Sequence, residues 1–322
     1  MIGNHKALNT LPIGQSVQQQ GDKCCIELGE GKITLNKESG GYWIVSQNTL
    51  ADVELVKAIV LMVEQRKDIR CIELNDNAAP ALDDIAQVSA EGIKLAWRES
   101  LLQLPEFWLQ QQRRIIPHKQ ILAGNGYHPL RPRPQKGELY RRYIPELAQT
   151  LSLVGVNVDE HAEVFSKWQN SHRVAAFWEQ TGSLEEHKSY LEEQLADDKN
   201  QLLIVCLNNE PFAYIEAYWT KEDRIAPYYP AGDYDRGIHM LVGEEHHRGS
   251  HKIAAWLPSV CHFLYLSEPR TEKIISEPRA DNAKMISYLQ AYGFAKLKEF
   301  DFPHKRAALM CQLRDTFFSD CF

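Results

Sequence analysis

Two polar residues in the second half of the chain have side chains that carry protons in enzymes. His239 stands in the middle of the apolar stretch GIHMLVG (237–243). Asp281 and Asn282 stand side by side in EPRADNAKMISYLQAYGF (277–294). A neutral imidazole beside a bound ligand can act as a general base, and a carboxylate can accept or orient a proton. The simpler interpretations are a core histidine and an Asp–Asn pair that caps a helix.

A charged turn follows the histidine-bearing stretch and leads into an apolar helix pattern. It contains Arg248, Gly249, Ser250 and then Lys252. The first turn of a helix exposes N–H groups and the positive end of the macrodipole, which together suit a phosphate or pyrophosphate. A glycine there lets a ligand approach the backbone, and the cationic side chains add charge. The alternative is an ordinary strand–turn–helix with a solvated charged start.

Histidines near this turn also raise the question of a metal site. His247 and His251 have the i,i+4 spacing with which a helix can hold zinc. The zinc-protease pattern places Glu directly after the first histidine, whereas this chain has Arg248 there. Gly249 also weakens a helix between the two rings. We therefore predict no metal site from this pair.

Composition limits the classes of protein that the chain can belong to. Of its 322 residues, 44% are hydrophobic and 25% are charged, as in globular proteins with a core. A net charge of -7 disfavours a general nucleic-acid binder. No apolar leader and no membrane-spanning run is visible, and the cysteines form no CxxC pair. The adjacent Cys24 and Cys25 are expected to pack a strand. We expect a reducing, cytoplasmic setting.

Prolines divide the chain into regions. Five of them, together with polar residues and glycines, occupy the stretch from Ile116 to Pro145. Proline lacks an N–H and restricts the residue before it, so this stretch predicts an extended connector. The expected organisation is an N-terminal domain at 1–125, a connector at 126–145 and a second domain at 146–322.

Hydrophobic periodicity predicts both helices and strands in each domain. In the first domain we expect strands at 22–28, 31–36, 41–46 and 70–74, and helices at 51–66 and near 81–98. In the second we expect strands at 146–153, 201–207, 211–219, 237–243, 273–278 and two more after 293, with helices at 159–168, 183–196, 249–266 and 281–292. The predicted class is α/β (α+β), with a mixed central sheet flanked by helices.

This order of elements resembles the GNAT family of acyl-CoA-dependent N-acyltransferases. The resemblance lies in the strand before the Arg248–Gly249 turn and in the Asn282-started helix that ends at Gly293–Phe294. In that family the strand pairs with the pantetheine arm and the turn holds the CoA pyrophosphate. The resemblance therefore assigns acetyl-CoA contacts to Met240, Leu241, Val242, Arg248, Gly249, Ser250, Lys252 and Asn282.

The chain departs from the GNAT pattern at two places. The later glycine positions of the loop are His251 and Ile253. The tyrosine that often protonates the leaving thiolate in the family falls at Leu289, beside Tyr288. The resemblance therefore leaves the thiolate acid open.

Several longer motifs resemble the siderophore acetyltransferases within the GNAT family. They are HPLRPRP (128–134), FSKWQNSHRVAAFWEQ (165–180), AYWTKEDRIAPYY (217–229), DRGIHMLVG (235–243) and SEPRADN (276–282). The resemblance implies acetylation of N6-hydroxylysine to a hydroxamate of the aerobactin type, with acetyl-CoA as cosubstrate. It assigns catalysis to His239 and Asp281, and implies a degenerate GNAT-like N-terminal domain.

The resemblance also indicates how the substrates would be held. Substrate-binding candidates in or directly beside the matched motifs are Trp168, Asn170, Arg173, Glu216 and Tyr228. Backbone N–H groups of residues 240–242 would hold the oxyanion. The enzyme itself would need no metal, since iron would be bound by the product. Three alternatives stay open: another acyl-CoA, N5-hydroxyornithine as substrate, or a non-catalytic CoA-binding or docking subunit. A homo-oligomer and a functional link to the hydroxylase and synthetase of the pathway also stay open.

Overall fold

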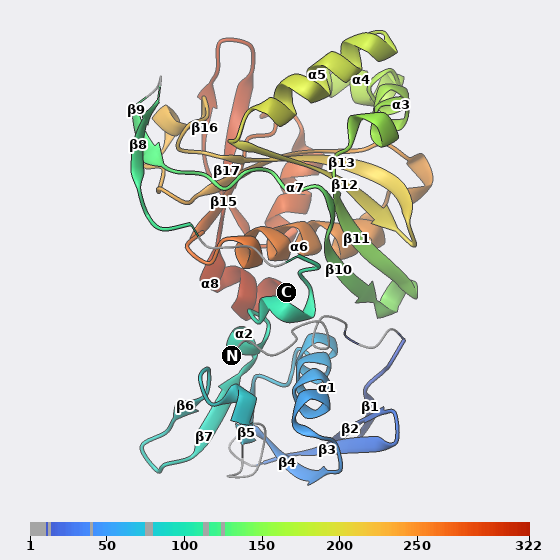
Figure 1. Cartoon of the computed structure of the whole chain (residues 1–322), viewed down its shortest axis with the longest axis vertical. Coiled ribbons are helices and arrows are strands. Elements are labelled where there is room, and N and C mark those ends of the chain that lie inside the picture. Colours follow the sequence, from blue (N-terminus) through green and yellow to red (C-terminus); the bar gives the residue numbers. More distant parts are fainter. Residues whose placement is uncertain (1–10, 12–13, 39–40, 75–79, 112–115, 124–125) are drawn as a thin grey trace. The chain divides into compact units, whose positions relative to one another are not determined.

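The chain forms two compact units, each with its own mixed β-sheet (Figure 1). The computed structural model describes residues 11, 14–38, 41–74, 80–111, 116–123 and 126–322. The first unit comprises residues 1–109, 143–149 and Phe322, and the second comprises 110–142 and 150–321. The predicted mixed sheets with flanking helices are confirmed.

The first unit contains a sheet with the strand order β1-β2-β3-β4-β5-β7-β6. Helix α1 (Asp52–Gln65) links β4 to β5, which pair in parallel and so require a crossover connection. Nine consecutive residues of α1, 55–63, are buried. Cys24 is buried and free, as expected of a packing residue. The strands are β1 (Gln18–Gln20), β2 (Lys23–Leu28), β3 (Gly31–Lys37), β4 (Trp43–Asn48), β5 (Cys71–Leu74), β6 (Gln87–Val88) and β7 (Lys94–Trp97).

The helices predicted near 81–98 are wrong. This segment forms the 3₁₀ turn η2 (Pro80–Leu82), strands β6 and β7, and only then the short helix α2 (Arg98–Leu101). Strand β7 pairs antiparallel with β5, so that Ala96 lies opposite Ile72. Pairing satisfies the backbone groups of the buried strand β5, and this long-range requirement overrides the local helical pattern.

The second unit contains a sheet with the order β10-β11-β12-β13-β14-β15-β17-β16. Its first strands are antiparallel, whereas β14 and β15 run parallel. Part of the predicted connector therefore forms strands. The strands are β10 (Gly137–Ile144), β11 (Gln149–Gly155), β12 (Asn200–Leu207), β13 (Glu210–Trp219), β14 (Arg236–Val242), β15 (Lys273–Ser276), β16 (Phe294–Asp301) and β17 (Arg306–Leu313), with β8 (Gln120–Ala123) and β9 (Gly126–Pro129) as a separate pair.

Helices cover both faces of the second sheet (Figure 1). On one face lie α3 (Val158–Gln169), α4 (His172–Trp178) and α5 (Leu184–Ala196). On the other lies α6 (Ser250–Ser267), of whose residues most are buried. Helix α5 starts in the capping box of Ser183 and Glu186, and helix α4, which the sequence analysis did not predict, starts at a Ser171 cap.

The two sheets share one pattern of connections. In each sheet, antiparallel strands are followed by a crossover helix, α1 or α6, and then by a strand that pairs in parallel, β5 or β15. The last two strands form a hairpin, and the second of them, β7 or β17, pairs with that strand. Both parallel pairings are short: β4 meets β5 only at Trp43 and Ile44, and β14 meets β15 only at Arg236 and Gly237. In both units the two parallel strands therefore pair at one end only.

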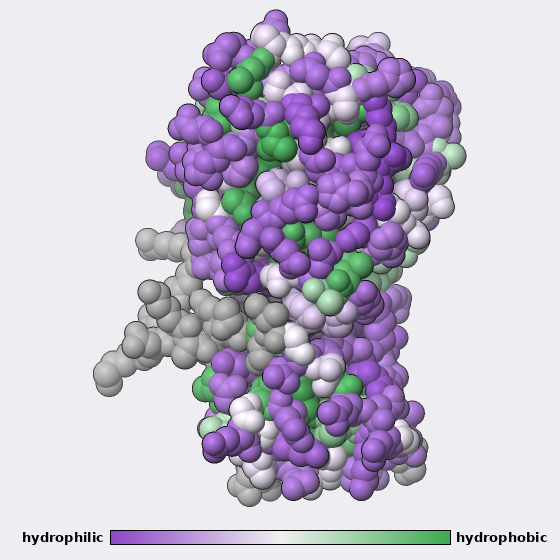
Figure 2. Space-filling view, turned by 90° about the vertical axis from the view of Figure 1, so that its right-hand side faces the viewer, coloured by the Kyte–Doolittle hydropathy of each residue, from purple (hydrophilic) through white to green (hydrophobic). Residues whose placement is uncertain are grey.

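The outer surface is largely polar on the face shown in Figure 2, where hydrophobic residues form small separate groups. Among the described residues, no helix combines the length and apolar character that a bilayer crossing requires.

Candidate active site

A cavity of about 750 Å³ lies in the second unit. It is lined by side chains from α4, α5, β13, β14, the segment after β15 and the start of helix α7 (Ala283–Ala291). This volume lies in the range of small-molecule sites, about 300–1,000 Å³.

His239 is held in this cavity by two carboxylates. It lies directly opposite Glu216 in the β13–β14 pairing, so that the two side chains share one face of the sheet. The His239 Nδ1 atom is 3.0 Å from Glu216 Oε2, and its Nε2 atom is 2.5 Å from Glu277 Oε1. Glu277 directly follows β15. Because both ring nitrogens face carboxylate oxygens, both act as donors, as in an imidazolium.

The charges in this group stabilise one another. Burial alone would lower the pKa of His239, but the carboxylates of Glu277 and Glu216 outweigh it and raise this pKa to about 10. Burial would raise the pKa of Glu277, but His239 and Lys305 hold it at about 2. At neutral pH the cluster is therefore an imidazolium between two carboxylates. In this state His239 can donate a proton but cannot accept one.

Tyrosines complete the hydrogen bonds of both carboxylates. Tyr190 and Tyr214 donate to Glu216 Oε1 at 2.5 and 3.0 Å. Tyr218 donates to Glu277 Oε2 at 2.8 Å. Burial raises the pKa of each tyrosine, so all three remain neutral donors. A buried charged group with its partners satisfied in this way is held in one geometry.

Two glycines of the His239 segment make room for aromatic rings. A Cβ on Gly237 would lie 2.1 Å from the Tyr218 ring, and one on Gly243 would lie 2.1 Å from the Trp168 ring. Trp168 is buried, and its indole N–H donates to Glu244. The spacing of these glycines around His239 therefore has a packing reason.

Of the predicted substrate-binding residues, Glu216 lines the cavity. Asn170 instead exchanges hydrogen bonds with the backbone of Gly182, closing the loop before α5. The Tyr228 ring packs against Phe300, with ring centroids 4.4 Å apart. Substrate contacts by Trp168, Asn170 and Tyr228 stay predictions.

Asp281 and Asn282 are adjacent in the sequence but make different contacts. Asn282 accepts a hydrogen bond from the Met285 N–H and caps α7, and it also lines the cavity. Asp281 is exposed and forms an ion pair with Arg279 at 2.9 Å, and hydrogen bonding from Arg279 lowers the pKa of its carboxyl. Within the described part of the chain, no hydrogen bond joins Asp281 to His239. The catalytic role of Asp281 stays a prediction.

Near the end of β14, the backbone N–H and C=O groups of successive residues point alternately to the two edges of the strand. The Gly243 N–H donates to Phe212 O of β13. Because backbone groups alternate along a strand, those of Met240 and Val242 face the opposite edge, where β15 no longer pairs. Leu241 faces β13, and its side chain is buried in the core. The guanidinium of Arg173 donates to Val242 O and Gly243 O there.

The turn before α6 has the features of an anion site. Gly249 has φ 118°, a conformation that favours glycine, and it precedes a helix with no side-chain cap at its start. The Lys252 and Ile253 N–H groups bond back to Gly249 O, whereas Arg248 and Ser250 are exposed beside the first turn. The exposed first turn of α6 is thus available to an anion.

Sequence reasoning missed Glu277, Tyr190, Tyr218 and Lys305. Glu277 stood in the quoted motif SEPRADN (276–282), but only Asp281 and Asn282 were selected from it. An acidic residue directly after an apolar strand is the signal that was present. Its pairing with His239 depends on β14 and β15 lying side by side, which the local sequence does not specify.

The cavity also carries side chains of both charges. Acidic residues are Glu179, Glu216, Glu222, Asp223 and Glu277, and cationic ones include Arg224, Arg279 and Lys305. Burial, and then the charge of Glu277, raises the pKa of Asp223. The Lys305 Nζ atom donates to the Glu277 backbone carbonyl at 2.9 Å.

Comparisons with known proteins identify a family and related structures. Residues 157–302 match the family model of an acetyltransferase (GNAT) domain. An uncharacterized protein from Bacillus halodurans has a similar solved structure, with 31% identity and a TM-score of 0.54 over 58% of this chain and 97% of that one.

Curated relatives are similar over much of the chain. A putative lysine N-acyltransferase of Schizosaccharomyces pombe is 42% identical over 69% of this chain and 66% of its own length. An N(6)-hydroxylysine O-acetyltransferase of Escherichia coli is 41% identical over 69% of this chain and 71% of its own. An N(5)-hydroxyornithine:cis-anhydromevalonyl coenzyme A-N(5)-transacylase of Beauveria bassiana is 43% identical over 60% of this chain and 44% of its own. The chain therefore belongs to the GNAT acetyltransferase family.

Proposed function

We propose that this protein transfers the acetyl group of acetyl-CoA to the hydroxylamino nitrogen of N6-hydroxylysine. The product is a hydroxamate, the iron-chelating group of siderophores of the aerobactin type. The observation that carries the proposal is the His239 cluster, which lies in a cavity beside the unpaired edge of β14. The names of the relatives from Escherichia coli and Schizosaccharomyces pombe support the choice of substrate.

The acyl donor would lie along the end of β14. The backbone groups of Met240 and Val242 would pair with the pantetheine amides, as a neighbouring strand would. Arg248 and the first turn of α6, with Gly249, Ser250 and Lys252, would hold the pyrophosphate. This placement brings the thioester towards His239.

The reaction would then proceed by direct attack. The neutral hydroxylamine nitrogen attacks the thioester carbon, and the oxyanion that forms is stabilised by the Met240 N–H. The C–S bond breaks, the thiolate takes a proton from the imidazolium of His239, and the new N–C bond remains. The attacking nitrogen must lose its proton. Asp281 would accept it, because its neighbours Arg279 and Asn282 line the cavity.

The charges of the cavity suit an amino-acid substrate. A hydroxylated lysine carries an α-carboxylate and an α-ammonium group, which require opposite partners. Arg224, Arg279 and Lys305 would bind the carboxylate, and Glu222 and Asp223 would bind the ammonium group. A substrate without these groups would lose both sets of charge contacts and should bind more weakly.

The test combines two measurements. Purified protein and acetyl-CoA are mixed with lysine, N6-hydroxylysine or N5-hydroxyornithine, and thiol release is followed. Products are then treated with ferric iron, because an N-acylated hydroxylamine gives a coloured ferric hydroxamate whereas an O-acylated one does not. We expect thiol release and colour with N6-hydroxylysine. No hydroxylamine-dependent thiol release would refute transfer, release without colour would refute N-acylation, and a preference for N5-hydroxyornithine would refute the substrate assignment.

A further inference from the structure

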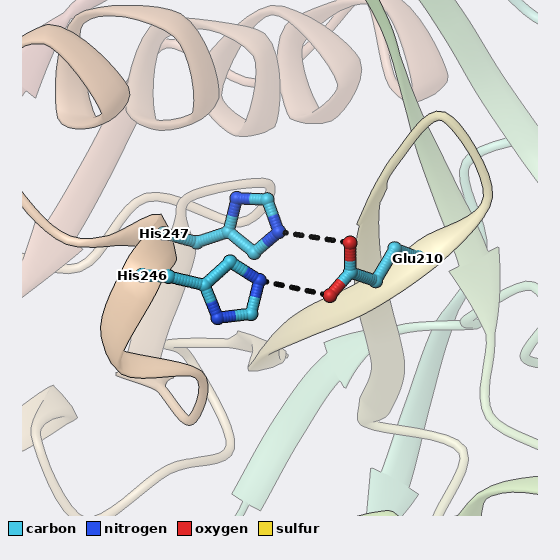
Figure 3. A group of neighbouring side chains, drawn as sticks. All are labelled: Glu210, His246 and His247. Atoms are coloured by element: carbon cyan, nitrogen blue, oxygen red, sulfur yellow. Dashed lines mark hydrogen bonds and ion pairs between the residues drawn. The ribbon is translucent and has the colours of Figure 1, made fainter.

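A second polar group lies outside the cavity, where the β12–β13 hairpin approaches the short 3₁₀ helix η6 (Glu245–His247) (Figure 3). Glu210 is the first residue of β13, and His246 and His247 come from η6. The His246 Nε2 atom is 2.9 Å from Glu210 Oε1, and the His247 Nε2 atom is 3.4 Å from Oε2. Both rings thus face one carboxylate, one ring towards each oxygen.

The imidazole of His247 is the unusual member of this group. The residue is only 3% exposed, and its ring packs against that of Phe212, with centroids 4.9 Å apart. Within the part of the chain that the structure describes, the Nε2 atom has the 3.4 Å contact with Glu210 Oε2, and the Nδ1 atom makes no hydrogen bond. A buried polar group without a hydrogen bond is destabilising, so its retention calls for a partner.

The spacing of the three side chains suits a tetrahedral ion. Zinc binds nitrogen and oxygen ligands at about 2.1 Å, and two such ligands at a tetrahedral angle lie about 3.4 Å apart. The Glu210–His247 separation already has this value, 3.4 Å, and the ligand atoms all lie within 4.8 Å of one another. The closer His246 ring is exposed and can move outward by the small distance required.

We propose that Glu210, His246 and His247 bind a divalent transition-metal ion of the zinc type, with water in a fourth position. Two imidazoles and a carboxylate favour zinc over magnesium or calcium, which prefer sets of oxygen ligands. His251, which was considered from the sequence as a partner of His247, is not part of this group.

The bound ion would stabilise the fold and would take no part in acyl transfer, because none of its three proposed ligands lines the cavity. The ion would fasten the β12–β13 hairpin to η6. The next residues along the chain are Arg248 and Gly249. Metal binding would therefore restrain the turn before α6 and stabilise the folded second unit.

Zinc titration of a tag-free, chelator-treated protein tests the proposal. Isothermal titration calorimetry compares the wild type with Glu210→Gln and His246→Gln, which alter exposed side chains and so spare the core. His251→Gln is the matched control, since it removes an exposed histidine from the same segment. We expect each ligand variant to bind zinc at least about tenfold more weakly, and the control to bind as the wild type does. Equal zinc affinity in all four proteins, or equal affinity of the wild type for magnesium, would overturn the proposal.

Thermal unfolding provides an independent measurement. An ion that binds only the folded state raises the melting temperature. Zinc should therefore raise the melting temperature of the wild type and of His251→Gln, and raise that of Glu210→Gln much less. The shift should shrink at pH 5.5, where protons compete for the imidazoles. An equal shift in Glu210→Gln would contradict the assignment, whatever the activity of the enzyme.

Discussion

Replacing Glu277 by Gln removes one of the two carboxylates beside His239 while keeping the shape of the side chain. The charge of Glu277 is the largest influence that raises the pKa of His239 from its ordinary 6.5 to about 10. Stabilisation by the protonated ring is fully present below pH 6.5 and is lost as the pH rises through 10. In Glu277→Gln the pKa of His239 should fall towards its ordinary value, and this stabilisation should disappear at lower pH.

The size of the effect follows from proton linkage. Between pH 7 and 9 the native wild type holds one more proton at His239 than the unfolded chain does. Its free energy of unfolding should therefore fall by about 1.4 kcal/mol per pH unit from this group, or about 2.7 kcal/mol over the interval. Tyrosine and cysteine residues also titrate, but they are common to both proteins, so the difference between the two pH profiles isolates the cluster.

Urea unfolding at pH 7, 8 and 9 measures this difference. At pH 7 the variant should also be less stable by about 3 kcal/mol, because a buried charge has lost a partner. Glu193→Gln, on the exposed side of α5, is the control and should follow the wild type. If Glu277→Gln loses as much stability between pH 7 and 9 as the wild type does, then His239 is not the imidazolium that the geometry indicates.

Four further substitutions test the site. His239→Ala and Asp281→Ala should each lower kcat roughly a hundredfold or more. Asp281→Ala should change the melting temperature little, because Asp281 is exposed. A wild-type rate in either variant would show that the replaced residue takes no part in the mechanism. Gly237→Ala should displace the Tyr218 ring, because the new Cβ would lie 2.1 Å from it. The displacement should lower both the stability of the protein and kcat. An unchanged near-ultraviolet circular dichroism spectrum together with an unchanged kcat would contradict this prediction. Gly249→Ala should raise the KM for acetyl-CoA more than it changes kcat, since φ 118° is unfavourable for alanine, and equal KM values would argue against the turn as the phosphate site.

Most of the second sheet could be predicted from local patterns. The hairpin of β12 and β13 has Asn208 and Asn209 at its turn, both with positive φ, and apolar strands on either side. Helix α5 was predicted from its hydrophobic periodicity, and the structure adds the capping box at its start. Helix α4 was missed because it is short and follows α3 after only two cap residues, Asn170 and Ser171. Segment 81–98 was misassigned because the pairing of β7 with β5 is a long-range contact.

The active site was only partly predictable for the same reason. His239 was identified because a histidine is unusual in an apolar strand, and Glu216 because it directly precedes a matched motif. Their direct contact depends on the register between β13 and β14, and the contact with Glu277 depends on the parallel neighbour β15. Asp281 was selected by resemblance, and the structure places it in an exposed ion pair with Arg279.

The short parallel pairing found in both sheets has a consequence for the number of acyl-CoA molecules that one chain can hold. In each unit the crossover helix follows the first of the two parallel strands, at the end where these strands no longer pair. The first turns of the two helices differ in charge. Helix α1 has Asp52 and Glu54 in its first turn, whereas α6 has no acidic residue there. Carboxylates at a helix start repel a pyrophosphate that the bare N–H groups would otherwise attract. The chain should therefore saturate at one equivalent of CoA, with the first unit contributing a similar sheet but no second binding site.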